Sequence, residues 1–170
     1  ELHKEYGDLY DPLLCFEKMI CKIYEENREN PCYEEAYKTQ RVFLIKSSEC
    51  KMSVTPHRQI VCDPLIYNEL EKEGYVDVLP HKIDDIVKHI IMLRSAKHII
   101  TSYGGANCCN RFFFHPLATV KVICNQHYKS EYALEWHPRC SIYVAKKYIL
   151  YLDMPNILSV KEIQKILHIQ

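Results

Sequence analysis

The chain has 170 residues, of which 48% are hydrophobic, so it is long enough to bury one sizeable core but not two full domains. Lysine and arginine together number 22, as do aspartate and glutamate. A balanced charge argues against nucleic acid or an anionic membrane as the partner and favours a small ligand. No apolar run approaches the roughly 20 residues that span a bilayer, so no membrane segment is expected.

The first 40 residues are expected to form an N-terminal helix and a connector. Apolar residues recur at helical spacing through Leu13 to Glu26, which predicts an amphipathic helix. The segment Asn27 to Gln40 is polar and contains Asn30-Pro31, so we interpret it as a surface connector. A buried strand is then predicted at Arg41 to Lys46, because the centre of RVFLIK is unbroken and apolar.

The middle of the chain alternates strands and helices. Asp63-Pro64 combines an N-cap with a proline at the first helical position, and Gly74 closes the helix that this pair begins. A second helix carries the apolar stripe Ile83, Ile86, Val87, Ile90 and Ile91, with Asp84 and Asp85 at its start offsetting the dipole. The strands expected around these helices are Gln59 to Cys62, Tyr75 to Leu79, His98 to Ser102 and Thr119 to Ile123.

The tail continues the pattern. A helix is predicted near Tyr128 to Trp136 and a strand near Ser141 to Leu152. The last helix begins at Ser159, with Glu162 at the spacing of a capping box. The whole order predicts an α/β, Rossmann-like fold over residues 41–170, in which a parallel sheet has helices on both faces.

A glycine turn follows the strand at His98 to Ser102. Gly104-Gly105 can bring the backbone close to a ligand, and Ala106 to Phe113 can begin a helix. The first N–H groups of a helix have no internal partners, so this arrangement suits a pyrophosphate. Ligands of such sheets bind outside the carboxyl ends of the strands. The groups expected there are Lys46 and Ser47, the loop Pro80 to Lys82, the turn Ser102 to Asn110, and Cys124 to His127.

A family resemblance rests on this turn. GANCCNRFFFHPLA, from Gly105 to Ala118, aligns without gaps with the pattern GAGLTN followed by LFLPPGA, and it resembles glycosyltransferase family 61. RVFLIKSS together with Arg58 to Asp63 is similar to that family's strand end and the arginine-rich segment after it. The element order between Pro64 and Ile123 agrees as well. The resemblance covers about Leu13 to Ile123.

The resemblance implies an inverting transferase of the GT-B type, which moves xylose or N-acetylglucosamine from a nucleotide sugar without a required metal. This chain then corresponds to one half of a GT-B fold, the C-terminal half that binds the donor, with a UDP-sugar expected. A glycan or glycoprotein acceptor, and the catalytic base, would belong to a preceding domain. The family's usual compartment is the Golgi or endoplasmic reticulum lumen, and a viral relative would be cytoplasmic.

Donor-site residues follow from the charge of the diphosphate, which rises as the sugar leaves and which cations and helix amides can stabilise. Lys46 and Arg58 are candidate cations, although a solvated lysine and a loop ion pair are the ordinary alternatives. Tyr103 either borders the ligand or packs in the interior, and Asn110 either contacts the ligand or satisfies a local carbonyl. The full candidate set is Lys46, Ser47, Arg58, Tyr103, Gly104, Gly105, Ala106, Asn107 and Asn110.

Two alternatives remain within or beside this family. Gly104 stands where the family has histidine, Asn107 replaces its second motif glycine, and Lys46 replaces its strand-end arginine. These departures favour a degenerate, non-catalytic domain of the same descent that acts as a binding or interaction module. An unrelated Rossmann-like dinucleotide enzyme is the other alternative, but no G-x-G-x-x-G follows any predicted strand.

The cysteines give a weaker signal. There are nine, an odd number without a C-x-x-C pair, so no disulfide framework can be assigned, and Cys15, Cys21, Cys62 and Cys124 are expected to be core thiols. Cys124-Asn-Gln-His127 and His137-Pro-Arg-Cys140 could together close a tetrahedral zinc site. The predicted helix between them and the abundance of cysteine and histidine argue against it, so no metal is expected.

Overall fold

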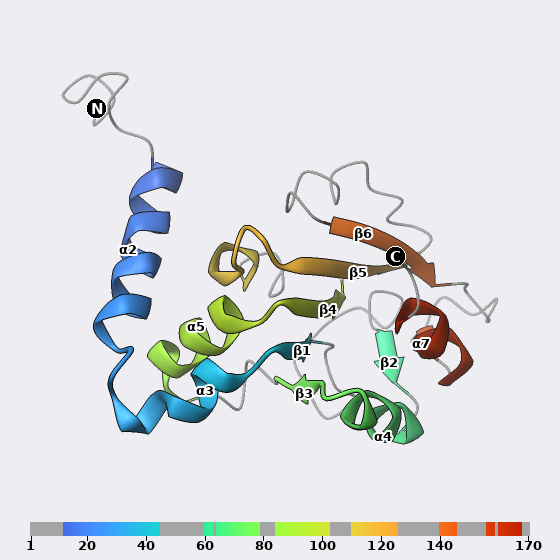
Figure 1. The fold of residues 1–170 in the computed structure, drawn as a ribbon. Coiled ribbons are helices and arrows are strands. Elements are labelled where there is room, and N and C mark those ends of the chain that lie inside the picture. Colours follow the sequence, from blue (N-terminus) through green and yellow to red (C-terminus); the bar gives the residue numbers. More distant parts are fainter. Residues whose placement is uncertain are drawn as a thin grey trace.

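A five-stranded parallel sheet organises the chain (Figure 1). The computed structural model describes residues 12–44, 60–62, 64–78, 84–102, 110–125, 140–145, 156–158 and 160–167. The strand order is β3-β1-β4-β5-β6. The strands are β1 (Arg41–Leu44), β3 (Val76–Asp77), β4 (His98–Ser102), β5 (Thr119–Asn125) and β6 (Cys140–Ala145).

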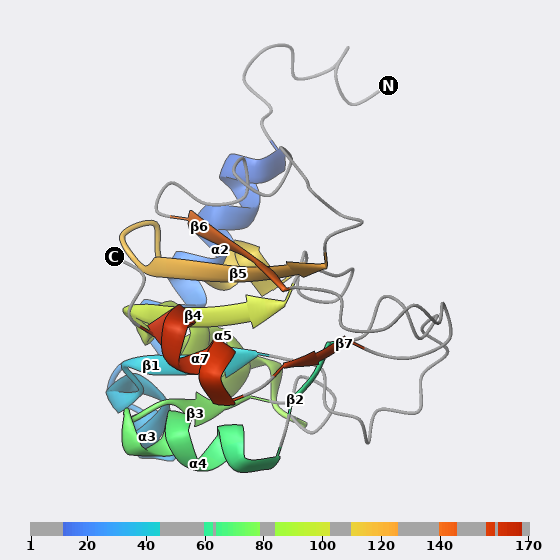
Figure 2. The same cartoon turned by 90° about the vertical axis from the view of Figure 1, so that its right-hand side faces the viewer.

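Helices cover both faces of this sheet. Figure 2 shows α4 (Pro64–Lys72) and α7 (Val160–Leu167) in front of the strands, and α5 (Ile86–Ser95) behind them. The 3-10 helix η5 (Arg111–Phe113) also lies on the side of α5, because Phe113 packs against the cluster that includes Leu93. The predicted α/β, Rossmann-like fold is therefore confirmed.

Alternation along the strands divides the core into two layers, since successive side chains of a strand point to opposite faces. In β1, Phe43 belongs to the layer under α4 and α7, whereas Val42 and Leu44 belong to the layer under α5. In β4, Ile100 and Ile99 divide in the same way. This is why the apolar run of the sequence is unbroken here: both of its faces are buried.

A lysine on β5 anchors the last helix. Lys121 donates hydrogen bonds to the carbonyl oxygens of Ile166, at 2.9 Å, and Leu167, at 3.0 Å. The ammonium group thereby satisfies carbonyls at the C-terminal end of α7, where a cation also complements the helix dipole. The amphipathic helix predicted after Ser159 is confirmed, with Ile163 and Ile166 fully buried.

The N-terminal helix α2 (Pro12–Glu26) confirms the helix predicted at Leu13 to Glu26. It packs against α5 and η5, with the ring of Phe16 in edge contact with Phe112 at 5.6 Å between centroids. Arg94 of α5 is 7% exposed and pairs with Glu17 of α2. The prediction that Cys15 is a core thiol is wrong, because Cys15 is exposed. Cys21 is only half-buried.

The connector predicted at Asn27 to Gln40 is wrong in part, because it contains helices η2 (Pro31–Tyr33) and α3 (Glu34–Lys38). The side chain of Asn30 accepts a hydrogen bond from the backbone N–H of Cys32 at 3.0 Å, and Pro31 occupies the first turn. Buried Ala36 anchors α3. The asparagine-proline pair thus begins a helix here rather than a loop.

Two helix ends agree closely with the sequence. Gly74 closes α4 with a φ of +75°, the left-handed conformation that glycine adopts without a Cβ penalty. Asp85 caps α5, its carboxylate accepting from the N–H groups of Val87 at 2.8 Å and Lys88 at 3.2 Å. The prediction that Ile86 belongs to the buried stripe is wrong, because Ile86 is the first helical residue and is 60% exposed.

A small second sheet pairs β2 (Ile60–Cys62) in parallel with β7 (Asn156–Leu158). The strand predicted at Gln59 to Cys62 therefore exists, but it lies outside the main sheet, and β7 was not predicted. In Figure 2 this pair lies toward the end at which β4 finishes. The helix predicted near Tyr128 to Trp136 and the end of the strand predicted at Ser141 to Leu152 lie outside the described residues.

Candidate functional site

The order of the main sheet reverses between β1 and β4. The chain passes from β1 to β3 on one side and then crosses back to β4 on the other, and β1 and β4 pair from Arg41↔His98 to Leu44↔Thr101. In chain order the five strands are arranged 2-1-3-4-5. Doubly wound sheets of this order bind ligands outside the carboxyl ends of the strands that flank the reversal.

The predicted site residues follow these two strands in sequence. Lys46 and Ser47 come two and three residues after the end of β1 at Leu44. The segment from Tyr103 to Asn107 follows the end of β4 at Ser102. These positions lie outside the described residues, as does Arg58. The strands that lead to them are neighbours in the sheet.

Asn110 is the member of the candidate set that the structure describes. It is 6% exposed, and its Oδ1 lies 3.0 Å from Nε2 of His89 on α5. Oδ1 can only accept a hydrogen bond, so His89 Nε2–H is the donor. The side-chain amide Nδ2 is buried and has no hydrogen-bond partner. The alternative that Asn110 satisfies a nearby carbonyl therefore finds no support among the described contacts.

His89 is a functional candidate that sequence reasoning missed. It is 4% exposed, and its ring meets Phe113 edge-on at 5.8 Å. Burial lowers the pKa of His89, and the hydrogen bond to Asn110 opposes that shift in part. The ring is therefore neutral near pH 7, and because Nε2 carries the proton, Nδ1 is left as a buried acceptor without a partner.

The beginning of α5 is not available to an anion. The Asp85 carboxylate already accepts from two of its first N–H groups, those of Val87 and Lys88, and these backbone hydrogen bonds lower the pKa of that carboxylate. A negative charge held at this position would repel a phosphate. At the carboxyl edge of the sheet, the helix start that remains a candidate for binding phosphate is the one predicted after β4, and not the start of α5.

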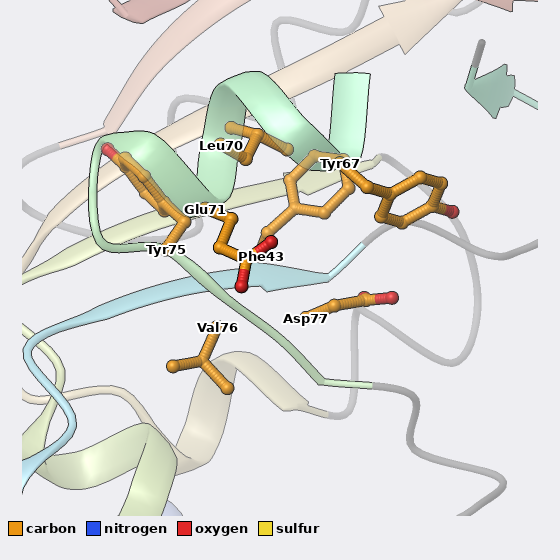
Figure 3. A pocket seen from close by; sticks show the side chains of 7 residues that line it. All are labelled: Phe43, Tyr67, Leu70, Glu71, Tyr75, Val76 and Asp77. Atoms are coloured by element: carbon orange, nitrogen blue, oxygen red, sulfur yellow. The ribbon is translucent and has the colours of Figure 1, made fainter. Parts of the chain in front are cut away.

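A separate pocket lies on the opposite face, between α4 and the β1–β3 edge (Figure 3). Its volume is about 320 Å³, and it is lined by Phe43, Tyr67, Leu70, Glu71, Tyr75, Val76 and Asp77. The 7 lining residues are all described, and they include two carboxylates but no lysine or arginine. Such a lining does not suit a diphosphate, so this pocket is not the candidate donor site.

Metal-binding clusters and membrane-spanning helices are absent from the described part of the chain. No group of three or more histidine, cysteine, aspartate or glutamate side chains there could hold a metal ion. The two histidines of the zinc alternative, His127 and His137, lie outside the described residues. None of the described helices is both long and apolar enough to cross a bilayer.

Comparison with known proteins adds no relative: no family model, no curated protein and no solved structure matches the chain. The candidate site therefore depends on the strand order, the motif after β4 and the buried pair His89 and Asn110.

Proposed function

We propose that this chain is the donor-binding half of an inverting glycosyltransferase related to family 61, and that its donor is a nucleotide sugar with UDP as the expected nucleotide. The observation that carries the proposal is the reversal of strand order between β1 and β4. The motif that resembles the family begins just after β4, and the candidate cation Lys46 comes just after β1. Motif and topology thus support the same edge of the sheet.

In this proposal the chain stabilises the diphosphate. The backbone N–H groups of Gly105 to Asn107 donate to phosphate oxygens, and Lys46 and Arg58 offset the charge that grows as the sugar leaves. Preorganised donors of this kind stabilise the leaving group without a metal ion. The catalytic base and the acceptor belong to a domain that precedes this one, so the chain alone binds donor but transfers little sugar.

A degenerate, non-catalytic binding module of the same descent is the second candidate. It is favoured by the replacements at Gly104, Asn107 and Lys46. Lysine supplies a point charge but lacks the forked geometry with which arginine holds a phosphate. A module of this kind would bind nucleotide weakly or not at all, so affinity separates the two candidates.

Calorimetric titration of the chain with UDP, GDP and their common sugar conjugates tests the proposal. We expect saturable binding of one nucleotide and its loss in Gly105→Val, where a side chain would block approach to the backbone. Gly74→Ala is the matched control. It also adds a side chain to a glycine, but Gly74 lies between the end of α4 and the beginning of β3, and thus at the amino end of that strand rather than at the carboxyl ends where the candidate site is expected. Absence of binding to every nucleotide, or equal affinity of Gly105→Val, would refute the donor-site proposal.

A further inference from the structure

The unpaired buried polar atoms of the described residues are gathered at one place. Throughout the described part of the chain, the only buried side-chain nitrogen or oxygen atoms without a hydrogen-bond partner are His89 Nδ1 and Asn110 Nδ2. Their residues contact each other through His89 Nε2 and Asn110 Oδ1. A buried polar atom without a partner costs about 1–3 kcal/mol. Two such atoms in one contact are therefore an exception that calls for an explanation.

Topology places this pair close to the candidate donor site. Helix α5 follows β3 and leads into β4, so its first turn lies near the carboxyl ends of the parallel strands and its last turn near their amino ends. His89 is the fourth residue of α5. Asn110 comes eight residues after the end of β4, directly before η5. Both residues thus belong to the edge at which the strand order reverses.

The pair leaves one donor and one acceptor unused. Asn110 Nδ2 can donate, and neutral His89 Nδ1 can accept. Other buried polar groups nearby are satisfied: Arg94, also on α5, donates to the Phe114 carbonyl at 2.9 Å and pairs with Glu17. A partner for Asn110 Nδ2 must offer an acceptor oxygen, as a phosphate or a hydroxyl group does. A hydroxyl group or an internal water could in addition donate to His89 Nδ1.

We propose that Asn110 Nδ2 donates a hydrogen bond to an oxygen of the bound nucleotide sugar, and that His89 is the positioning residue that holds the Asn110 amide in that orientation. The inference rests on the proposed function and deepens it: Asn110 already belongs to the candidate set, and the structure adds the donating atom and His89 as its buried partner. Without His89 the amide could rotate and present its oxygen to the ligand. His89 itself acts through Asn110.

The test measures UDP affinity and stability together. Asn110→Asp keeps the shape but replaces the donor by an acceptor, and His89→Leu removes the group that orients the amide. Loss of a hydrogen bond to a charged group corresponds to about tenfold to hundredfold weaker binding, and we expect both variants in this range. His89→Gln should bind closer to wild type than His89→Leu, because the glutamine amide can still donate to Asn110 Oδ1.

The stability measurement separates a binding role from a structural one. Thr39→Val is the control, because Thr39 is 8% exposed and its hydroxyl donates to the Glu35 carbonyl at 3.1 Å, so its loss removes a satisfied bond. The double variant His89→Leu/Asn110→Leu instead removes two unpaired atoms. We expect it to be at least as stable as the wild type while its UDP affinity falls at least tenfold.

The outcomes are distinct. If wild type binds UDP and His89→Leu binds it equally well, the positioning role is refuted and the proposed function stands. If the double variant is destabilised like Thr39→Val and its UDP affinity is unchanged, an internal water is the partner and the inference is again wrong. If wild type binds no nucleotide at all, the proposed function fails and this inference fails with it.

Discussion

The ion pair between Glu17 and Arg94 offers a sharp test of how α2 is held to the rest of the fold. The guanidinium side of the pair is 7% exposed, whereas the carboxylate side is 39% exposed. Arg94 also donates to the Phe114 carbonyl at 2.9 Å and lies 3.1 Å from Cys21 Sγ. The two partners are therefore unequal: removing Glu17 leaves a buried cation, and removing Arg94 leaves a carboxylate that water can reach.

The magnitudes follow from this inequality. Breaking a buried pair by deleting one partner costs about 3–5 kcal/mol, and Glu17→Ala should fall at the lower end, near 3 kcal/mol, because the carboxylate is part-exposed. Arg94→Met should cost about 1–3 kcal/mol, mainly through the Phe114 carbonyl that loses its donor. In the double variant no buried charge remains. We therefore expect Arg94→Met to stabilise the Glu17→Ala background although it destabilises the wild type.

Urea denaturation of wild type, both single variants and the double variant measures this directly. The control is Lys22→Met, which breaks the exposed pair between Lys22 and Glu26, 3.6 Å apart, and should change the free energy of unfolding by less than about 0.5 kcal/mol. If the two single effects simply add in the double variant, the cation is not buried against Glu17 and the reasoning is wrong.

Two further predictions concern the turn after α4 and the pH dependence of stability. Gly74→Ala should lower the free energy of unfolding by about 1–2 kcal/mol through backbone strain alone, since φ is +75° and no atom lies within 4 Å of the added Cβ. Gly74→Asn should lose less of the free energy of unfolding. Equal melting temperatures of Gly74→Ala and wild type would contradict the left-handed conformation assigned to Gly74. Burial lowers the pKa of His89 and of His98, so the unfolded chain takes up more protons than the folded one below about pH 6.5, and stability should fall as the pH drops through this window. His89→Gln should flatten this dependence in denaturation curves between pH 7 and pH 5, leaving the part due to His98, and an unchanged slope would show that His89 is not buried as described.

Local signals in the sequence predict most of the fold. The glycine at 74 and the acidic cap at 85 mark helix ends that depend on neighbouring residues alone, so they could be read directly. The unbroken apolar strands predict a sheet that is covered on both faces, and β1 and β4 confirm it. These features are predictable because short-range geometry determines them.

Elements that depend on distant partners were missed. The short helix α3 has five residues, too few to be stable alone, and it is held by contacts such as that between the rings of Tyr37 and Tyr24, 4.9 Å apart. The pairing of β2 with β7 joins segments nearly a hundred residues apart. In the site, Asn110 was expected from the motif, but its contact with His89 connects positions 21 residues apart in the chain. A histidine within an apolar helical stripe gives no sign in the sequence of the partner that it will meet.

Under the proposed function, binding and stability depend on different residues of helix α5. Both His89 and Arg94 are buried polar side chains on it. Arg94, near the amino ends of the strands, has partners in the Phe114 carbonyl, Glu17 and Cys21, as a group that stabilises a fold should. His89, near the carboxyl ends, contacts one partner and has a ring nitrogen without one, as does that partner's amide. A side chain whose hydrogen bonds are all satisfied in the free protein has no donor or acceptor left for a ligand. Substitutions at Arg94 should therefore change stability with little effect on nucleotide affinity. Substitutions at His89 should change nucleotide affinity with little effect on stability.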